Sequence, residues 1–187
     1  VVANALSRGL SPTVTALINP ISSPALEGPQ ALMTQLAIAY YRVADLLPET
    51  PSRTLLGHPL IVRVTSEFMA KTRDRELRAW IHNQHGQYFS QFADSRTLLQ
   101  AFRASVSHTV TEYADSIRTR TLLIVGERDD ITPLSEQLAL ARRLRDADLR
   151  IIPGVGHLVH YEAVDYAAEE LVAFLRAGLH VQDRVKS

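Results

Sequence analysis

The feature that most constrains the fold is a set of three short runs in which apolar residues follow one another without alternation. They are Thr13–Pro20, Thr119–Glu127 and Leu149–Gly154, and each ends at a turn residue. Near-continuous apolar runs are typical of strands buried on both faces in a parallel sheet that helices cover on both sides. The runs therefore predict an α/β protein with a parallel sheet.

Helical patterns separate and follow the second and third runs. Between them, residues 133–148 carry apolar residues at helical spacing behind Pro133. These residues are Leu134, Leu138, Ala141 and Leu144. After the third run, residues 162–178 are again helical, with Gly178 expected as the C-cap. A right-handed crossover would make the two strands neighbours in the sheet.

The segment between the first two strands is too long for an ordinary crossover connection. It contains no convincing parallel strand but several helical stretches. We therefore expect a helical cap inserted between two strands of the sheet. The expected parts are the start of the core at 1–23, the cap at 24–115, the rest of the core at 116–178 and a polar tail at 179–187.

Composition limits the partners and the chemistry. Lys+Arg and Asp+Glu both number 20, which argues against nucleic acid or an anionic membrane surface as the main partner. The absence of cysteine excludes disulfides, thiolate metal sites and cysteine nucleophiles. No apolar run approaches the roughly 18 residues of a membrane span, and the N-terminal residues lack a signal-peptide pattern. We expect a cytoplasmic protein that uses neither a metal nor an organic cofactor.

Two histidines at i,i+3 spacing could in principle ligate a metal. His82 and His85 share one face of a predicted helix, but no acidic third ligand is evident nearby. A packed or solvated pair is the favoured interpretation.

Two loops at strand ends carry the candidate chemistry. Gly126–Pro133 is acidic, and Gly154–Glu162 contains a histidine after Gly-Val-Gly. Ligands and catalytic groups gather at the carboxyl edge of open α/β sheets. A carboxylate there could orient an imidazole as the base half of a nucleophilic triad. Asp129 is the candidate acid and His157 the candidate base, although either could instead cap a turn or a helix.

The sequence "LLIVGERDDITP", followed by "GHLVHYE" and a terminal "LVAFL" helix, resembles the C-terminal half of α/β-hydrolase fold proteins. The resemblance implies that Asp129 is the triad acid, that His157 is the triad base, and that the cap selects the substrate. Asp130 stands where the family often has proline, which leaves Asp129 and Asp130 as alternatives. His160 and Glu162 are expected to support the site or open the next helix.

The nucleophile that this family requires is missing from the sequence. No Gly-x-Ser-x-Gly elbow occurs among the eight glycines. The nearest match surrounds Ser11, which follows a helix-like segment and precedes a strand, the reverse of an elbow. The first residues resemble the helix that follows the elbow, with Gly9 ending it. We therefore expect the nucleophile in a missing N-terminal half, present as a separate chain or lost.

The resemblance implies a serine esterase-type hydrolase of carboxylic esters. The expected partners are a small ester-like substrate and, because the open sheet edge leaves apolar surface uncovered, either the missing N-terminal half or further copies of the chain. Two alternatives stay open. One is an epoxide hydrolase or haloalkane dehalogenase-like enzyme with an aspartate nucleophile, and the other is a non-catalytic ligand-binding member of the fold.

Overall fold

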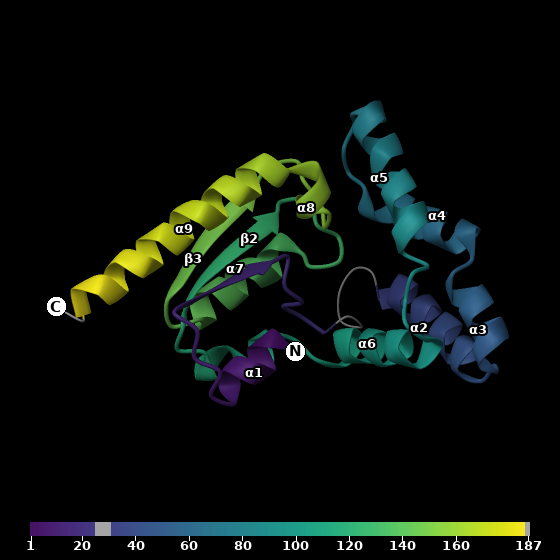
Figure 1. The fold of residues 1–187 in the computed structure, drawn as a ribbon, viewed down its shortest axis with the longest axis horizontal. Helices are drawn as coiled ribbons and strands as arrows, with labels where there is room; N and C mark the ends of the chain where they lie inside the picture. Colours follow the sequence, from purple (N-terminus) through teal and green to yellow (C-terminus); the bar gives the residue numbers. More distant parts are fainter. Residues whose placement is uncertain (25–30, 186–187) are drawn as a thin grey trace. The chain divides into compact units, whose positions relative to one another are not determined.

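A computed structural model describes residues 1–24 and 31–185, with side chains up to residue 178 (Figure 1). The chain divides into two compact units. The core unit comprises Val1–Ser23 and Thr109–Ser187, and the cap unit comprises Pro24–His108. Each unit is described by itself below.

The core unit is built on a three-stranded sheet. Its strands are β1 (Val14–Ile18), β2 (Arg120–Gly126) and β3 (Ala147–Ile152), in the order β1-β2-β3. Both pairings are parallel, and Leu123 lies opposite Leu17 on one side and Leu149 on the other. The predicted α/β architecture with a parallel sheet is confirmed.

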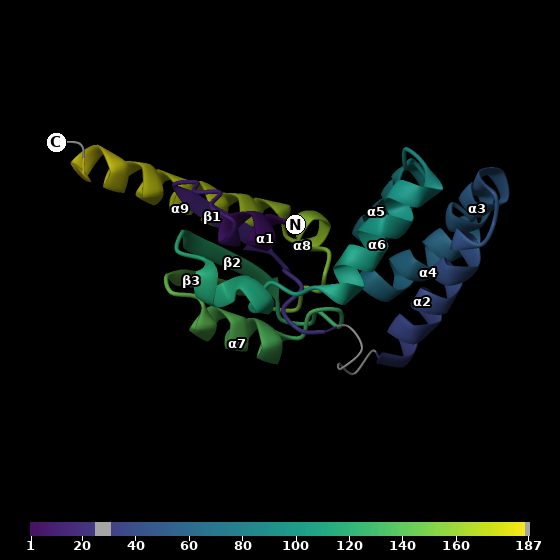
Figure 2. The same ribbon diagram turned by 90° about the horizontal axis from the view of Figure 1, so that it is seen from below.

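Helices cover both faces of this sheet. They are α1 (Val2–Ser7), the short 3-10 helix η1 (Thr111–Ser116), α7 (Leu134–Arg143), α8 (Val159–Glu162) and α9 (Val164–Val185). Figure 2 shows α7 and α9 on opposite sides of the strands.

The central strand β2 explains this layering. Leu123 and Val125 pack in a cluster with residues of α1, η1 and α7, whereas Leu122 and Ile124 pack with residues of α8 and α9. All four side chains are completely buried. Because successive side chains of a strand point to opposite faces, an uninterrupted apolar run serves both clusters at once.

The last helix is longer than the sequence suggested. Gly178 was expected as its C-cap, but α9 continues to Val185, so this assignment and the polar tail at 179–187 are wrong as far as Val185. Residues 186–187 lie outside the described part. A Cβ on Gly178 would lie 2.5 Å from Cγ1 of Val14. The glycine therefore lets the helix approach β1, which is a packing role rather than a terminating one.

Helix α7 is shorter than expected. It ends at Arg143, because Leu144 has an extended backbone with ψ of 140°. The Thr121 N–H then donates to the Asp146 carbonyl at 2.9 Å, and β3 begins at Ala147, two residues before the predicted start. Leu144 stays buried in the core cluster after the helix has ended, which is why its spacing suggested a longer helix.

The N-terminal helix ends as the sequence predicted. Gly9 has φ of +104°, a left-handed conformation that favours glycine. The Gly9 N–H donates to the Leu6 carbonyl and the Leu10 N–H donates to the Ala5 carbonyl. This pair of bonds is a Schellman motif, which satisfies carbonyls at the end of α1.

Helices and the turns that join them make up the described residues of the cap unit. Its helices are α2 (Ala31–Asp45), α3 (Glu49–Leu56), α4 (Pro59–Met69), α5 (Arg75–Tyr88) and α6 (Ser95–Ser107).

The cap ends at His108 rather than at residue 115. The residues that follow belong to the core unit, since the Val110 N–H donates to the Ile21 carbonyl at 2.7 Å. Ala114 and Ile117 are buried in the same core cluster as α1. The expected boundary of 24–115 is therefore too late.

A turn separates α4, which ends at Met69, from α5, which begins at Arg75. Asp74 caps α5, since its Oδ1 accepts from the N–H groups of Glu76 at 2.8 Å and Leu77 at 3.2 Å. The Arg78 guanidinium reaches back to the carbonyls of Ala70 and Thr72. These bonds stabilise the turn between the two helices.

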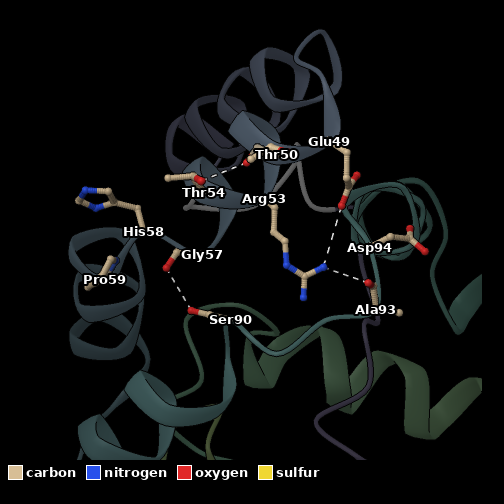
Figure 3. Close-up of a pocket in the computed structure, with 10 residues that line it drawn as sticks. All are labelled: Glu49, Thr50, Arg53, Thr54, Gly57, His58, Pro59, Ser90, Ala93 and Asp94. Atoms are coloured by element: carbon tan, nitrogen blue, oxygen red, sulfur yellow. Dashed lines mark hydrogen bonds and ion pairs between the residues drawn. The ribbon is translucent and has the colours of Figure 1, made fainter.

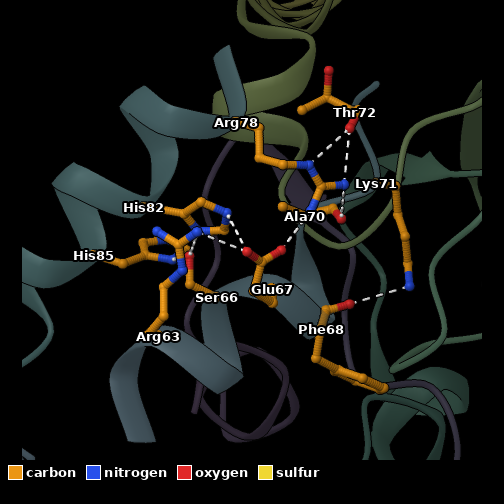
Figure 4. Close-up of polar contacts among 10 residues, drawn as sticks. All are labelled: Arg63, Ser66, Glu67, Phe68, Ala70, Lys71, Thr72, Arg78, His82 and His85. Carbon is orange, nitrogen blue, oxygen red and sulfur yellow. Dashed lines mark hydrogen bonds and ion pairs between the residues drawn. The ribbon is translucent and has the colours of Figure 1, made fainter. Parts of the chain in front are cut away.

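A buried polar cluster joins α4 to α5 (Figure 4). The hydroxyl of Ser66 lies 2.6 Å from Nδ1 of His82 and 2.7 Å from Nδ1 of His85. A hydroxyl has only one proton to give, so at least one of the two imidazoles must donate to it. The Glu67 carboxylate lies 3.2 Å from Nε2 of His82, outside good hydrogen-bond alignment, and its charge favours a proton on that nitrogen. Ser66 then donates to His82 and accepts from His85.

We expect this cluster to make the α4–α5 pair sensitive to acid. Burial lowers the pKa of His82 below 6.5, with contributions from Arg63 and Arg78, while Glu67 opposes the shift. As the pH falls below 6.5, His82 binds a proton in the unfolded state but stays neutral in the folded state, so the free energy of unfolding decreases. Amide hydrogen exchange should therefore show protection of α4 and α5 falling relative to β2 between about pH 7 and 5.

The matched control is His82→Asn, which keeps an acceptor near the position of Nδ1 but cannot be protonated. This variant should lose some stability at every pH and show a flatter pH profile in α4 and α5. An unchanged slope would mean that another group controls the response.

Candidate functional site

The two predicted loops meet at the carboxyl edge of the sheet. Asp129 lies in the loop after β2, and His157 lies in the loop after β3. Nδ1 of His157 lies 2.8 Å from Oδ2 of Asp129. The parallel pairing of β2 with β3 is what places two residues 28 positions apart within hydrogen-bond distance.

The Asp129 carboxylate is buried and held by several donors. Its side chain is 0% exposed. Oδ1 accepts from the N–H groups of Ile131 at 2.8 Å and Thr132 at 3.1 Å. Oδ2 accepts from the Thr132 hydroxyl as well as facing His157. The turn-capping role and the contact with His157 are therefore both present in one side chain.

These bonds keep Asp129 ionised despite its burial. Desolvation alone would raise the pKa of the carboxyl, but the hydrogen bond and charge of His157, together with the bonds from Thr132, hold the pKa below its usual value. An ionised Oδ2 accepts a proton-bearing Nδ1, which leaves the lone pair of the neutral imidazole on Nε2.

His157 has the opposite exposure. Its side chain is 28% exposed, and no side chain in the described residues makes a hydrogen bond with Nε2. Partial desolvation and the nearby charge of His157 lower the pKa of His160. The His157 ring is therefore partly exposed, while its Nδ1 is held by the buried Asp129 carboxylate.

The loop that carries His157 lies directly against the end of β2. A Cβ on Gly126 would collide with the Gly156 carbonyl oxygen and lie 2.6 Å from that of Val155. Only glycine permits this approach. The Glu162 carboxylate accepts from the Gly156 N–H at 3.1 Å, so this residue supports the loop.

Asn19 also belongs to this arrangement, although the sequence analysis did not identify it as a site residue. It follows β1, and its side chain bonds to Gly126, Gly156 and His157. The only local signal is an asparagine directly after an apolar run.

The remaining predicted residues take no part in the hydrogen bond between Asp129 and His157. Asp130 is exposed, and Ser11 is exposed in the segment between α1 and β1. His82 and His85 are buried around Ser66, as the packed interpretation expected. Within the described residues, no group of three or more His, Cys, Asp or Glu side chains could hold a metal ion.

A hollow of about 680 Å³ lies in the cap unit, beside α3 and the start of α4 (Figure 3). The Arg53 guanidinium in its wall is already bonded to the carbonyls of Ala93 at 3.0 Å and Phe92 at 2.7 Å. Asp94 caps α6 through the Thr97 N–H. Because these charged groups are used within the cap, the hollow offers little chemistry for a reaction.

The parallel sheet with helices on both faces, the helical unit inserted between two strands, and the acid–histidine pair at the carboxyl edge define an α/β-hydrolase fold. The sequence profile of the alpha/beta hydrolase family matches residues 2–173. The chain belongs to this family.

Solved structures agree with this assignment. MGS-M2, an alpha/beta hydrolase enzyme from a Medee basin deep-sea metagenome library, is 19% identical with a TM-score of 0.70, over 93% of this chain and 60% of that one. The enol-lactonase of Burkholderia xenovorans is 16% identical with a TM-score of 0.69, over 93% and 60%. A thermophilic esterase of Thermogutta terrifontis is 19% identical with a TM-score of 0.65, over 89% and 56%. At these identities the likeness shows the fold alone, and the chain spans about three fifths of these proteins.

One curated protein matches over a short segment. The peroxisomal membrane protein LPX1 of Saccharomyces cerevisiae is 42% identical over 55 residues, which is 29% of this chain and 14% of that protein. Among the helices of the described part, none is both long and apolar enough to cross a membrane.

The contact between Gly126 and the histidine loop generates a prediction. Gly126→Ala should force the loop away from β2, because the added methyl group meets backbone rather than a flexible side chain. We expect a loss of about 2–4 kcal/mol in unfolding free energy. Chemical denaturation measures the loss, and increased amide exchange at residues 155–157 would localise it.

Gly86→Ala provides the control. This glycine lies within α5 and has nothing within 4 Å of its Cβ position, so alanine should be neutral or stabilising by up to about 1 kcal/mol. A Gly126→Ala protein as stable as Gly86→Ala would contradict the close approach.

Proposed function

We propose that this chain forms the histidine- and acid-bearing part of a serine esterase-type hydrolase that acts on carboxylic esters. The observation that carries the proposal is the 2.8 Å contact between His157 Nδ1 and the buried Asp129 carboxylate, with Nε2 facing away from it. Family membership supports the hydrolase class.

Each residue has one role in this proposal. Asp129 fixes the tautomer of His157 and stabilises the imidazolium when it forms. Nε2 of His157 takes the proton of a serine hydroxyl as that oxygen attacks the ester carbonyl, and then returns it to the leaving alcohol. In deacylation, Nε2 takes a proton from water as the water oxygen attacks the acyl carbon. It then gives that proton to the serine oxygen as the bond between the acyl carbon and this oxygen breaks, which releases the carboxylic acid and restores the serine.

The serine itself is proposed to lie outside residues 1–187, in a missing N-terminal half. The sequence contains no Gly-x-Ser-x-Gly elbow, and no described serine bonds to His157. One edge of β1 also has no strand beside it in the described part of the chain. Strands of the N-terminal half would cover that edge, or a second copy of the chain would. A cytoplasmic location belongs to the same proposal.

The nucleophile can be tested with a fluorophosphonate probe. Intact mass and peptide mapping of the whole protein should show one adduct, on a serine outside residues 1–187. This chain alone should neither be labelled nor hydrolyse esters, because its histidine lacks the group that it activates.

Turnover or labelling by a sample that contains only residues 1–187 would contradict the proposal. An unlabelled whole protein, verified to contain its N-terminal half, would instead favour an aspartate nucleophile or a non-catalytic receptor.

The acid and the base can be tested by paired substitutions. His157→Ala should lower kcat by at least ~10³ in the intact enzyme, because no other group takes the serine proton. Asp129→Asn should lower kcat by at least ~10², because it disturbs the tautomer of His157. Steady-state ester hydrolysis measures both effects.

Asp130→Asn is the matched control for the neighbouring acid. Asp130 is exposed, so its kcat should stay within about threefold of the parent. A larger effect at Asp130 than at Asp129 would reverse the assignment of the acid.

A further inference from the structure

The side chain of Asn19 connects the ends of two strands to the histidine loop. Its residue is only 5% exposed, and its φ of +42° is a left-handed conformation that asparagine tolerates better than most residues. The Asn19 N–H donates to the Ile124 carbonyl at 2.9 Å, which extends the pairing of β1 with β2 to this position.

The amide of this side chain uses all of its donors. Nδ2 donates to the carbonyls of Gly156 at 3.1 Å and His157 at 2.9 Å, while Oδ1 accepts from the Gly126 N–H at 2.9 Å. Only one orientation of the amide fits two acceptors on one side and a donor on the other. The side chain therefore bonds to the backbone of the histidine itself.

The backbone that carries Asn19 is anchored independently of the histidine loop. The buried Gln137 amide donates to the Pro20 carbonyl at 2.7 Å. The Ile21 carbonyl accepts from the Val110 N–H, and the Ser22 carbonyl accepts from the Thr111 hydroxyl. Asn19 thus projects from a fixed support.

We infer that Asn19 is a positioning residue for His157. It acts on the backbone of His157, and through it keeps Nδ1 at 2.8 Å from Asp129 and Nε2 aimed away from the carboxylate. Glu162 holds the same loop through the Gly156 N–H. The expected effect of Asn19 on kcat rests on the proposed function. Its effect on the position of the His157 ring does not.

Asn19→Asp tests the inference with the smallest change in shape. The carboxylate keeps an acceptor for Gly126 but places negative charge against the two carbonyl oxygens that Nδ2 now serves. In the intact protein labelled with 15N-histidine, we expect the His157 Nδ1 proton to exchange with water at least about tenfold faster. In the ester assay, kcat should fall about tenfold with KM little changed.

Asn19→Gly is the second variant, because glycine adopts the same φ without strain and removes every side-chain bond. If Asn19→Asp fails to fold, the exchange rate of the His157 Nδ1 proton is measured in Asn19→Gly instead. Ile117→Val is the control, since it weakens the buried core without touching the site. It should lower the melting temperature and leave the exchange of the His157 Nδ1 proton unchanged.

The inference is overturned if both Asn19 variants exchange this proton within twofold of Ile117→Val, since Asn19 would then serve stability alone. A parent protein that does not hydrolyse esters would defeat the proposed function. The exchange comparison would still decide the role of Asn19, so the two failures can be told apart.

Discussion

The parallel pairing of β2 with both of its neighbours is the constraint on which the site depends. Because all three strands run in the same direction, their carboxyl ends meet at one edge and bring together Asn19, Asp129 and His157. The close approach at Gly126 then fixes how near the histidine loop can come. A slip of β2 by one residue would exchange the side chains that its two faces present and move the Asp129 loop relative to Asn19 and His157.

The sequence predicted the parts of this arrangement that have a local signal. Uninterrupted apolar runs predicted the strands. The acidic loop after one strand and the histidine-bearing loop after the next indicated that the candidate site lies at the carboxyl edge of the sheet. It missed what depends on distant contacts. Gly178 looks like a C-cap, and only the approach of Val14 explains it as a packing residue. Asn19 bonds to backbone groups of Gly126, Gly156 and His157, which lie 107 to 138 positions away in the chain. No local sequence pattern can indicate such contacts.

Two pairs of a histidine and an acid stand out in the described part of this chain, and only the pair in the cap has a serine beside it. In the cap, Ser66 and His82 adjoin Glu67, but Ser66 is fully buried and also contacts a second imidazole. Its oxygen has no path to a substrate, so the cluster serves the packing of α4 on α5. At the sheet edge the acid is buried while the histidine is partly exposed. Burial strengthens the contact that orients the imidazole, and exposure leaves Nε2 accessible for proton transfer.

The residues that support the His157 loop, Asn19 and Glu162, are polar, and the chemistry of a histidine explains why. A histidine that changes charge during a reaction experiences varying electrostatic forces, and apolar packing alone does not fix a ring's direction. The Asn19 amide bonds to the His157 carbonyl and the Glu162 carboxylate to the Gly156 N–H, while Asp129 bonds to the ring itself. Each of these bonds contributes only about 1 kcal/mol to folding, or somewhat more where a charge takes part. Their greater effect is to reduce the number of orientations available to His157, which is the kind of preorganisation that proton transfer requires.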